Sequence, residues 1–317
     1  MKHIFIVNPV SGRSDASQVL VPRIIQTAQA AGVDYQIELT RAPHHATQLA
    51  RQYAWQDGES RIYACGGDGT LNEVLAGAWD SPRAQVGCVP CGSGNDFVRN
   101  FSDPEAFLDI DAQLRGDSAA IDLVRTDRGV AAAICSAGLD AQVAYGIPKF
   151  RRLPLCGGQM AYNLSIVQQV CGRLGRRLRI VADGREYTGE YLMAAVCNGV
   201  SYGGGFRAAP LARMDDGLLD LVLVKKVSRL RIARVVGMYK AGEHFQNGRI
   251  RPELADVISF TRAKQVEIHS MDGQPVIINV DGECQPALKL ETAVLPAAGR
   301  AALPQGVTLS AGCSVQG

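Results

Sequence analysis

The chain has 317 residues, of which 47% are hydrophobic and 20% charged, so it is long enough for two globular units that each bury a core. It contains no apolar run of the roughly 18 residues that span a bilayer, and its N-terminal apolar stretch is too short for a signal peptide. Nine scattered cysteines fit a reducing compartment better than a disulfide framework. We therefore expect a cytoplasmic protein.

The net charge of +2 hides an asymmetry between the two halves of the chain. Residues 1–125 carry 10 Lys and Arg against 15 Asp and Glu, giving −5, whereas residues 126–317 carry 23 against 16, giving +7. A basic second half suits an anionic surface, either a membrane or a nucleic acid. The sequence has no RNA-type aromatic motif and no zinc-finger spacing, so we favour a membrane and expect no nucleic-acid partner.

In the first 125 residues, short apolar runs alternate with helical patterns. We expect strands at 3–7, 33–39, 61–65, 85–89 and 119–125, and helices at 15–31, 44–56, 71–78 and 103–114. Strand and helix alternating at this spacing predict a doubly wound, mostly parallel sheet. In such sheets ligands bind beyond the carboxyl ends of the strands, where the polar and glycine-rich loops of this half fall.

From Val130 the pattern changes to alternating runs joined by turns, which predicts a mainly antiparallel β sandwich with helices near 158–172 and 228–241 on its outside. We therefore divide the chain into residues 1–125 and 126–317. The C-terminal tail, about 297–317, is assigned to the second unit but is able to pack back on the first. The basic stretches 173–179 and 225–236 are candidates for contact with anionic headgroups, although a solvated face is the favoured interpretation of each one taken alone.

One loop is rich in glycine and follows the strand at 61–65. It reads Cys65-Gly66-Gly67-Asp68-Gly69-Thr70, and an amphipathic helix leaves it. Glycines at φ > 0 with a bare backbone, together with the N–H groups at the start of a helix, make a site for a phosphate. The alternative is a plain strand-to-helix turn with Asp68 as a cap. The loop is not a P-loop, because no Gly-Lys-Ser/Thr follows.

A second loop of this kind follows the strand at 85–89 and spans residues 90–97. Its glycines and the Ser93 hydroxyl suit an anion, and Asp96 adds a carboxylate able to reach a metal-bound water. The alternative is a helix start capped by Ser93 or Asn95. Cys88 and Cys91 have the Cys-x-x-Cys spacing, but no second pair stands at zinc spacing, so we expect neither a metal nor redox chemistry there.

Two stretches of the second half carry carboxylates that are candidates for metal binding or for catalysis. Residues 213–218 offer carboxylates and turn carbonyls for a hard cation such as Mg²⁺. Asp281 and Glu283 stand two apart at a strand end, on the same side if the strand continues. Both stretches contain Asp-Gly, which is also the signature of an ordinary hairpin turn.

These motifs together resemble the signature of the diacylglycerol-kinase-like lipid kinases, a superfamily that includes sphingosine kinases and is distantly related to NAD kinases. The first motif is Gly66-Gly67-Asp68-Gly69-Thr70 with Asn72-Glu73, and the second runs from Pro90 to Phe97. The resemblance covers nearly the whole chain. It implies an NAD-kinase-like first domain, an active site in the cleft between two domains, ATP as phosphoryl donor and Mg²⁺ as cofactor.

The resemblance also assigns roles to residues of this chain. For the nucleotide, the matching or adjacent positions are Asn8, Ser11, Thr40, Gly66, Gly67, Asp68, Gly69, Thr70, Leu71, Asn72, Ser93 and Asn95. For Mg²⁺ they are the Asp216 side chain and the carbonyls of Arg213 and Leu218, with Asp96 as a further metal candidate. Asp281 and Glu283 match the catalytic element, without a decision on which is the base, and Asp68 is the third catalytic candidate.

The resemblance thus implies an ATP- and Mg²⁺-dependent kinase that phosphorylates a hydroxyl of a diacylglycerol-like lipid at the inner face of a membrane. A sphingoid base or another lipid is an alternative acceptor. A kinase of a soluble nucleotide and a non-catalytic nucleotide sensor are more distant alternatives. The sequence leaves open whether the protein forms a homodimer.

Overall fold

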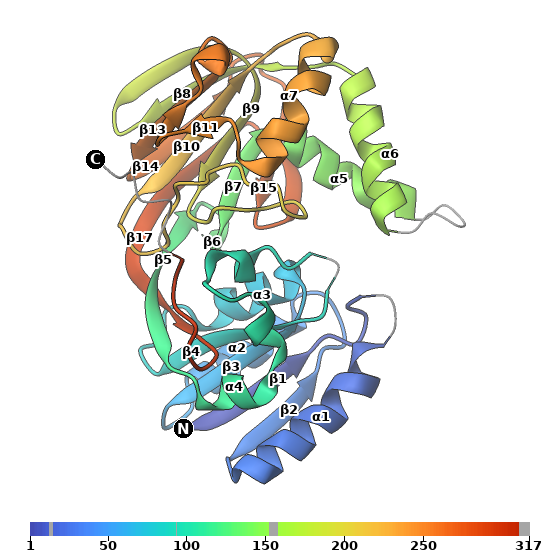
Figure 1. Cartoon of the computed structure of the whole chain (residues 1–317), viewed down its shortest axis with the longest axis vertical. Coiled ribbons are helices and arrows are strands. Elements are labelled where there is room, and N and C mark those ends of the chain that lie inside the picture. The colour runs from blue at the N-terminus through green and yellow to red at the C-terminus, as the bar shows by residue number, and fades with distance from the viewer. Residues whose placement is uncertain (13–14, 93, 152–157, 311–317) are drawn as a thin grey trace.

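The computed structural model describes residues 1–12, 15–92, 94–151 and 158–310. Figure 1 shows two lobes stacked along the long axis, with the N-terminal lobe at the bottom and the later lobe at the top. The chain crosses between them more than once, so that the lobes share strands as well as side-chain contacts.

The first lobe is built on four parallel strands in the order β2-β1-β3-β4. They are β1 (Lys2–Val7), β2 (Tyr35–Leu39), β3 (Ser60–Gly66) and β4 (Ala84–Pro90). Helix α1 (Ala16–Ala31) packs on one face, while α2 (His45–Ala54) and α3 (Asp68–Ala78) pack on the other. The predicted doubly wound parallel sheet is confirmed.

The ends of α1 show why the sequence pattern located it well. The Asp15 side chain accepts the N–H of Ser17, and Gly32 adopts the left-handed conformation at the C-terminal end with φ of 65°. A side-chain N-cap and a left-handed glycine are the strongest local signals for where a helix begins and ends.

The expectation of one continuous helix at 103–114 is wrong, because the segment forms two separate helices. The short helix η1 (Phe97–Asn100) precedes this region, which contains the short helix η2 (Glu105–Leu108) and then α4 (Ile110–Arg115). The Asp103 side chain accepts the N–H groups of Glu105 and Ala106 at the start of η2, but Asp109 accepts those of Asp111 and Ala112 and so starts a second helix. A strong N-cap inside a helical pattern interrupts the helix because the capping residue itself is extended.

The second lobe is an antiparallel β sandwich around a core of aliphatic side chains, as predicted. Its long strand β9 (Arg185–Cys197) pairs with β8 (Arg176–Ala182) through its first half, and with β7 (Ile134–Gly138) and β10 (Leu219–Lys225) through its second. Strands β13 (Ile258–Ala263), β14 (Gln265–Ser270), β15 (Val276–Val280) and β16 (Glu283–Ala287) complete the sandwich. Short strands β6 (Gly129–Ala131), β11 (Phe245–Gln246) and β12 (Arg249–Ile250), with helix η3 (Pro252–Leu254), lie in its connections.

Three helices flank this sandwich. Helices α6 (Gly158–Cys171) and α7 (Arg229–Ala241) agree with the helices expected near 158–172 and 228–241. Helix α5 (Leu139–Arg151) was not expected, because Gly146 and Pro148 interrupt its pattern. Among the described residues, no helix is both long and apolar enough to cross a membrane.

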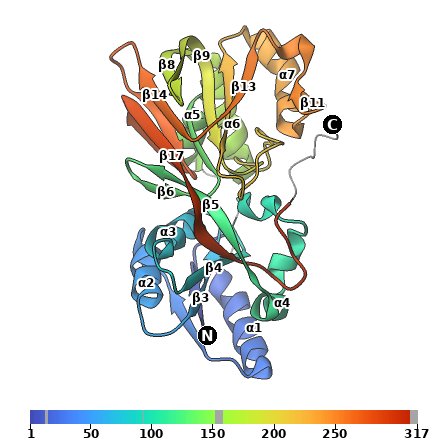
Figure 2. The same cartoon turned by 90° about the vertical axis from the view of Figure 1, so that its left-hand side faces the viewer.

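Strand β17 (Lys289–Ala302) joins the two lobes. It pairs with β14 in the second lobe, runs antiparallel to β5 (Ser118–Thr126) and meets β4 at Ala301. Figure 2 shows β17 and β5 descending together from the upper lobe to the lower one. Downstream, Leu303 and Val307 are buried in the core of the first lobe. The last seven residues of the expected tail, 311–317, lie outside the described residues.

Candidate active site

Three loops meet at the carboxyl ends of β1, β3 and β4. The Asn8 amide donates to the Thr70 hydroxyl at 3.1 Å, which joins the first loop to the second. The N–H groups of Cys91 and Gly92 both donate to the Gly66 carbonyl, at 3.0 and 3.2 Å, which joins the third loop to the second. The loops that sequence placed on one rim of the sheet therefore form one continuous surface.

The glycines of this surface are required for close packing of backbone against backbone. The expectation that they adopt φ > 0 is wrong for Gly66, Gly67 and Gly69. A Cβ at Gly67 would lie 2.9 Å from the Gly94 carbonyl oxygen, and one at Gly92 would lie 2.4 Å from the Gly67 Cα. Any side chain at Gly67 or Gly92 would therefore push the two loops apart.

Helix α3 begins at Asp68, so Gly69 and Thr70 lie in its first turn. Their N–H groups have no acceptor within the helix, and the positive end of the helix dipole lies at the same place. Space next to Gly69 is open, since a Cβ built there would meet no atom within 4 Å. An exposed helix start with open space beside it fits a phosphate group of a nucleotide.

Asp68 ties the first helical turn to the third loop. Its carboxylate accepts the N–H of Asp96 at 2.9 Å and that of Phe97 at 3.3 Å. Burial raises the pKa of Asp68 to about 6, and the charges of Asp96 and Asp281 act in the same direction while the two N–H groups oppose them. The alternative interpretation, in which Asp68 caps its own strand-to-helix turn, is wrong, because Asp68 lies inside the first turn of α3 and its carboxylate binds the third loop instead.

Asp96 connects the two lobes. Its carboxylate oxygens accept the N–H groups of Gly204 and Gly205 in the second lobe, at 2.7 and 2.8 Å, and Arg99 forms an ion pair with it at 3.3 Å. The Asp68 carboxylate therefore binds the backbone of Asp96, and the carboxylate of Asp96 in turn binds the second lobe.

Asp281 approaches the same region from the second lobe. Its carboxylate accepts the N–H groups of three successive residues, which are Ala132, Ala133 (3.0 Å) and Ile134 (2.8 Å). The amide of Asn72, on α3, also donates to it at 3.4 Å. Burial raises the pKa of Asp281, and the backbone N–H groups partly offset that effect.

The expectation that Asp281 and Glu283 lie on one side of a continuing strand is wrong. Asp281 and Gly282 form a tight turn between β15 and β16, with φ of 44° and 96°. The turn sends Asp281 inward to Asn72 and leaves Glu283 exposed at the start of β16. Asp-Gly with both residues at positive φ is the two-residue hairpin turn that the sequence analysis named as the alternative.

The remaining nucleotide candidates lie at or near the three loops. Ser11 and Thr40 follow β1 and β2, and the Thr40 N–H donates to the Val7 carbonyl at 2.9 Å. Leu71 is buried in the core beneath the sheet, and its N–H donates to Gly67. The Asn95 amide donates to the Gly92 carbonyl, while its buried Oδ1 has no partner among the described residues. Ser93 lies outside the described residues.

The candidate Mg²⁺ segment is a turn before β10. The Arg213 side chain pairs with Asp215 at 3.0 Å, and Asp216 accepts the N–H of Leu218 at 3.1 Å. Burial raises the pKa of Asp216, which is half-buried. Its carboxylate and the turn carbonyls are the hard oxygen donors that Mg²⁺ prefers, so the donor set fits this ion. Nowhere in the described chain do three His, Cys, Asp or Glu side chains converge into a metal-binding group.

Sequence analysis missed Asp122, a buried carboxylate that organises this segment. It accepts the N–H of Gly217 at 2.6 Å and that of Ala297 at 2.8 Å, and so fixes the turn before β10 against β17. Its partners are 95 and 175 residues away, so no local motif could have identified it.

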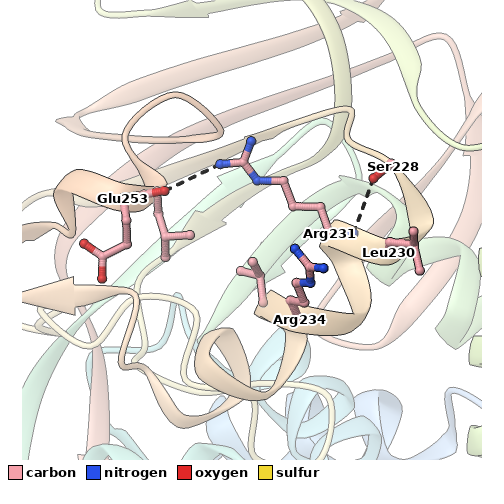
Figure 3. Close-up of a pocket in the computed structure, with 7 residues that line it drawn as sticks. Ser228, Leu230, Arg231, Arg234 and Glu253 are labelled. Carbon is pink, nitrogen blue, oxygen red and sulfur yellow. Dashed lines mark hydrogen bonds between the residues drawn. The ribbon is translucent and has the colours of Figure 1, made fainter.

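The basic stretches that sequence analysis singled out are largely engaged in internal contacts. Arg231 forms a bidentate pair with Asp256 at 2.8 Å. It also donates to the Glu253 carbonyl, a contact that Figure 3 shows. Arg173 and Arg179 pair with Asp272 and Glu186. A shallow depression of about 550 Å³ lies against α7, where Arg234 and the 75% exposed Leu230 remain at the surface. Its lining residues belong to the second lobe and are not part of the three-loop surface.

Comparison with known proteins assigns both lobes to families. Residues 2–126 match the diacylglycerol kinase catalytic domain, and residues 133–302 match the YegS C-terminal NAD kinase beta sandwich-like domain. Diacylglycerol kinases of Staphylococcus carnosus and Bacillus subtilis are each 29% identical, over 280 and 281 residues. These alignments cover 88% of this chain and 87% and 88% of the relatives.

Solved structures resemble the whole chain. Two structures from Bacillus anthracis, described as diacylglycerol kinases, superpose with TM-scores of 0.73 and 0.68 at 22% and 18% identity. Each match covers 95% of this chain and 96% of the other. At this level of identity the likeness establishes the fold.

Proposed function

The chain belongs to the kinase family that these two domains define, and from this premise we propose that it is an ATP- and Mg²⁺-dependent lipid kinase. The acceptor in this proposal is a hydroxyl of a diacylglycerol-like lipid, in line with the names of the relatives. One observation supports the proposal above others. Three carboxylates, those of Asp68, Asp96 and Asp281, gather where the glycine loops of the first lobe meet the second lobe.

The first lobe would hold the nucleotide. In our proposal the N–H groups of Gly69 and Thr70 bind its phosphates, and Asn8 keeps Thr70 in place. Phosphoryl transfer needs accurate positioning and neutralisation of charge more than it needs covalent chemistry. Mg²⁺, when bound, would supply that neutralisation. The three carboxylates form no metal-binding group among the described residues, but their negative charge favours a cation in the space beside the phosphates.

The two late carboxylates would have separate roles. Asp281 has its oxygens occupied by N–H donors, so we assign it to holding the second lobe against α3. Glu283 is exposed and follows the turn directly, so we assign it to accepting the proton of the lipid hydroxyl. A base must have a lone pair available within reach of the proton that it removes.

In our proposal the second lobe contacts the membrane. Leu230 is 75% exposed between basic residues of α7, and Arg234 is exposed one turn further along. An apolar side chain flanked by cations suits an anionic bilayer surface. We propose transient, peripheral contact from the cytoplasmic side.

The test is transfer of labelled γ-phosphate from ATP to a panel of acceptors that includes diacylglycerol, a sphingoid base and NAD. We expect Mg²⁺-dependent label in diacylglycerol, absent in the Gly67→Val variant. Transfer to NAD alone, or to no lipid of the panel, would contradict the proposal. Transfer to the sphingoid base alone would correct the acceptor and leave the lipid kinase.

A further inference from the structure

Arg99 is an exposed cation at the edge of the candidate active site. It lies in η1, the short helix that directly follows the third loop. Its side chain is 54% exposed, and its Nε lies 3.3 Å from one carboxylate oxygen of Asp96. Neither of the two terminal nitrogens of the guanidinium donates to another of the described residues. Arg99 therefore retains donors that are open to a ligand.

Arg99 lies on the side of the phosphate site that faces the second lobe. Asp68, in the first turn of α3, accepts the N–H of Asp96, and the Asp96 carboxylate binds Gly204 and Gly205 of the second lobe. The Arg99 guanidinium lies beside the same contact, since a Cβ built on Gly205 would be 3.7 Å from its Cζ. Neither of these glycines has a side chain that could cover the guanidinium. Arg99 is thus placed between the proposed donor site and the lobe that would supply the acceptor.

The charge around this position is otherwise negative. The carboxylates of Asp68, Asp96 and Asp281 gather where the two lobes meet. Arg99 has the only cationic side chain among the described residues of the three loops and η1, namely 8–12, 66–72, 90–92 and 94–100. A triphosphate at the start of α3 would add further negative charge to this region. Arg99 is the side chain of these loops that is able to offset it.

A structural role accounts for only part of this arrangement. Asp96 is buried, and its two oxygens already accept N–H groups at 2.7 and 2.8 Å. An ion pair with a largely exposed arginine adds little to stability, because water competes for the guanidinium. The contact through Nε also leaves unused the pair of terminal nitrogens with which arginine binds phosphate oxygens. A phosphate as second partner explains why the guanidinium is held in this way.

We propose that Arg99 binds the γ-phosphoryl group of the nucleotide and stabilises the charge that this group carries during transfer. Asp96 holds the guanidinium through Nε, and the terminal nitrogens donate to γ-phosphate oxygens. In the transfer, the acceptor oxygen bonds to the γ-phosphorus, the bond from this phosphorus to ADP breaks, and the acceptor proton goes to Glu283. Arg99 forms no covalent bond. This inference rests on the proposed kinase function and adds to it a residue that distinguishes ATP from ADP.

The experiment measures nucleotide binding by calorimetry, with Mg²⁺ and without lipid. The probes are ADP and the β,γ-imido analogue of ATP, which carries a γ-phosphate. In Arg99→Gln we expect the affinity for the ATP analogue to fall by about 10–100-fold, as for loss of hydrogen bonds to a charged group. The affinity for ADP should stay within about twofold. Arg99→Lys keeps the charge without the paired nitrogens and should lose less.

Turnover gives a second measurement. In Arg99→Gln the turnover number with ATP should fall by about 10²–10³-fold, the range for loss of one donor to a charge that develops in the transition state. In Arg99→Lys it should fall less. If Arg99→Gln binds both nucleotides as the wild type does, the γ-phosphate contact is overturned.

Arg83→Gln is the matched control. The Arg83 side chain is 55% exposed and lies 3.6 Å from Asp57, so its loss changes the net charge and removes a surface ion pair as Arg99→Gln does. Arg83 directly precedes β4, at the end of the sheet opposite the three loops. Both affinities should stay at the wild-type level in this variant. An equal loss of affinity for the ATP analogue in Arg83→Gln and Arg99→Gln would show a general effect of charge and overturn the contact.

A purely structural role gives a different result. If Arg99 only supports Asp96, Arg99→Gln should lower the melting temperature and weaken the binding of both nucleotides by the same factor, as Asp96→Asn should. Such a result would overturn the inference.

The inference and the proposed function can also fail separately. If Arg99→Gln binds the ATP analogue more weakly and ADP equally well, while no lipid is labelled by the wild type, the γ-phosphate contact stands and the lipid acceptor fails. If Arg99→Gln labels lipid at the wild-type rate with both affinities unchanged, the proposed function stands and the contact fails.

Discussion

The side-chain amide of Asn72 donates to the carboxylate of Asp281 across 209 residues of sequence, and this contact joins the helix of the first glycine loop to the late turn of the second lobe. The same Asn72 amide donates to the Val130 carbonyl at 3.3 Å. The orientation of the second lobe is thus set at the residue that follows the glycine motif by two positions. Phosphate binding at the start of α3 and placement of the acceptor lobe share one anchor.

This arrangement predicts that substitutions of Asp281 and Glu283 have different effects on turnover and on melting temperature. Glu283→Gln should lower the turnover number by about 10²–10⁴-fold, the range for loss of a general base, and leave the melting temperature unchanged. Asp281→Asn should lower both, because an amide NH₂ cannot accept the N–H groups of Ala132, Ala133 and Ile134. Nucleotide affinity, measured by calorimetry, should persist in Glu283→Gln. Near-normal turnover in both variants would move the base elsewhere, with Asp68 as the first candidate.

Gly67→Val should abolish nucleotide binding in a folded protein. The valine Cβ would lie 2.9 Å from the Gly94 carbonyl oxygen, so the second and third loops must separate. Nucleotide affinity by calorimetry and the circular dichroism spectrum check the two parts of this prediction. Gly237→Ala on α7 is the control, since its added Cβ meets nothing within 4 Å and both affinity and fold should be retained. Unchanged affinity in a folded Gly67→Val protein would remove the three-loop surface as the nucleotide site.

The fold of the first lobe could be predicted because its signals are local. Strands and helices of the parallel sheet differ in hydrophobic period, and Asp15 and Gly32 mark helix ends by their own chemistry. In the second lobe, α5 was missed because Gly146 and Pro148 disturb its pattern, while burial between α6 and the sandwich stabilises it. Tertiary packing therefore decides where local propensity is ambiguous.

The residues of the candidate site likewise divide into those marked by a local sequence motif and those that only the tertiary fold brings together. The glycine loops are local motifs, and sequence placed them on one rim of the sheet. Asp122 carries no motif, because its neighbours come from distant segments of the chain. For Asp281, the sequence allowed either a continuing strand or a hairpin turn, and only the pairing of β15 with β16 decides for the turn.

Asp216→Ala should weaken the response of the protein to Mg²⁺. If Asp216 and the carbonyls of its turn hold the ion, Mg²⁺ stabilises the folded state by mass action in the wild type. We expect the Mg²⁺-induced rise in melting temperature to be lost in the variant, together with part of the activity. Asp215→Ala, which removes only the partner of Arg213, is the control and should keep the rise. An equal rise in wild type and Asp216→Ala would identify Asp216 as a turn residue only.

Binding to vesicles should depend on Leu230 as well as on charge. Because Leu230 is 75% exposed on α7 and Arg234 is exposed beside it, Leu230→Asp should weaken sedimentation with vesicles that contain anionic lipid. Binding by the wild type should rise with anionic lipid content and fall with salt. Val19→Asp, an exposed position of α1 in the other lobe, should have no effect. Equal binding to neutral vesicles at every salt concentration would contradict electrostatic contact.

Asp68 should make both stability and activity depend on pH near 6. Its pKa is raised from 3.8 to about 6, mainly by burial, so the folded chain binds more protons than the unfolded chain between these values. The free energy of unfolding should therefore fall as the pH rises from about 4 to about 6, by at most about 3 kcal/mol at about 1.4 kcal/mol per pKa unit. Activity should rise over the same interval, because the ionised carboxylate is the form that attracts a cation.

Asp68→Asn should flatten the stability profile and lose activity at every pH. Some pH dependence should remain in this variant, since burial raises the pKa of Asp220 to about 6 as well. Denaturant unfolding at pH 4.5 and pH 7 in both proteins checks the sign, and a stability that increases between these values in the wild type, but not in Asp68→Asn, would show that Asp68 is ionised and stabilised in the folded chain instead.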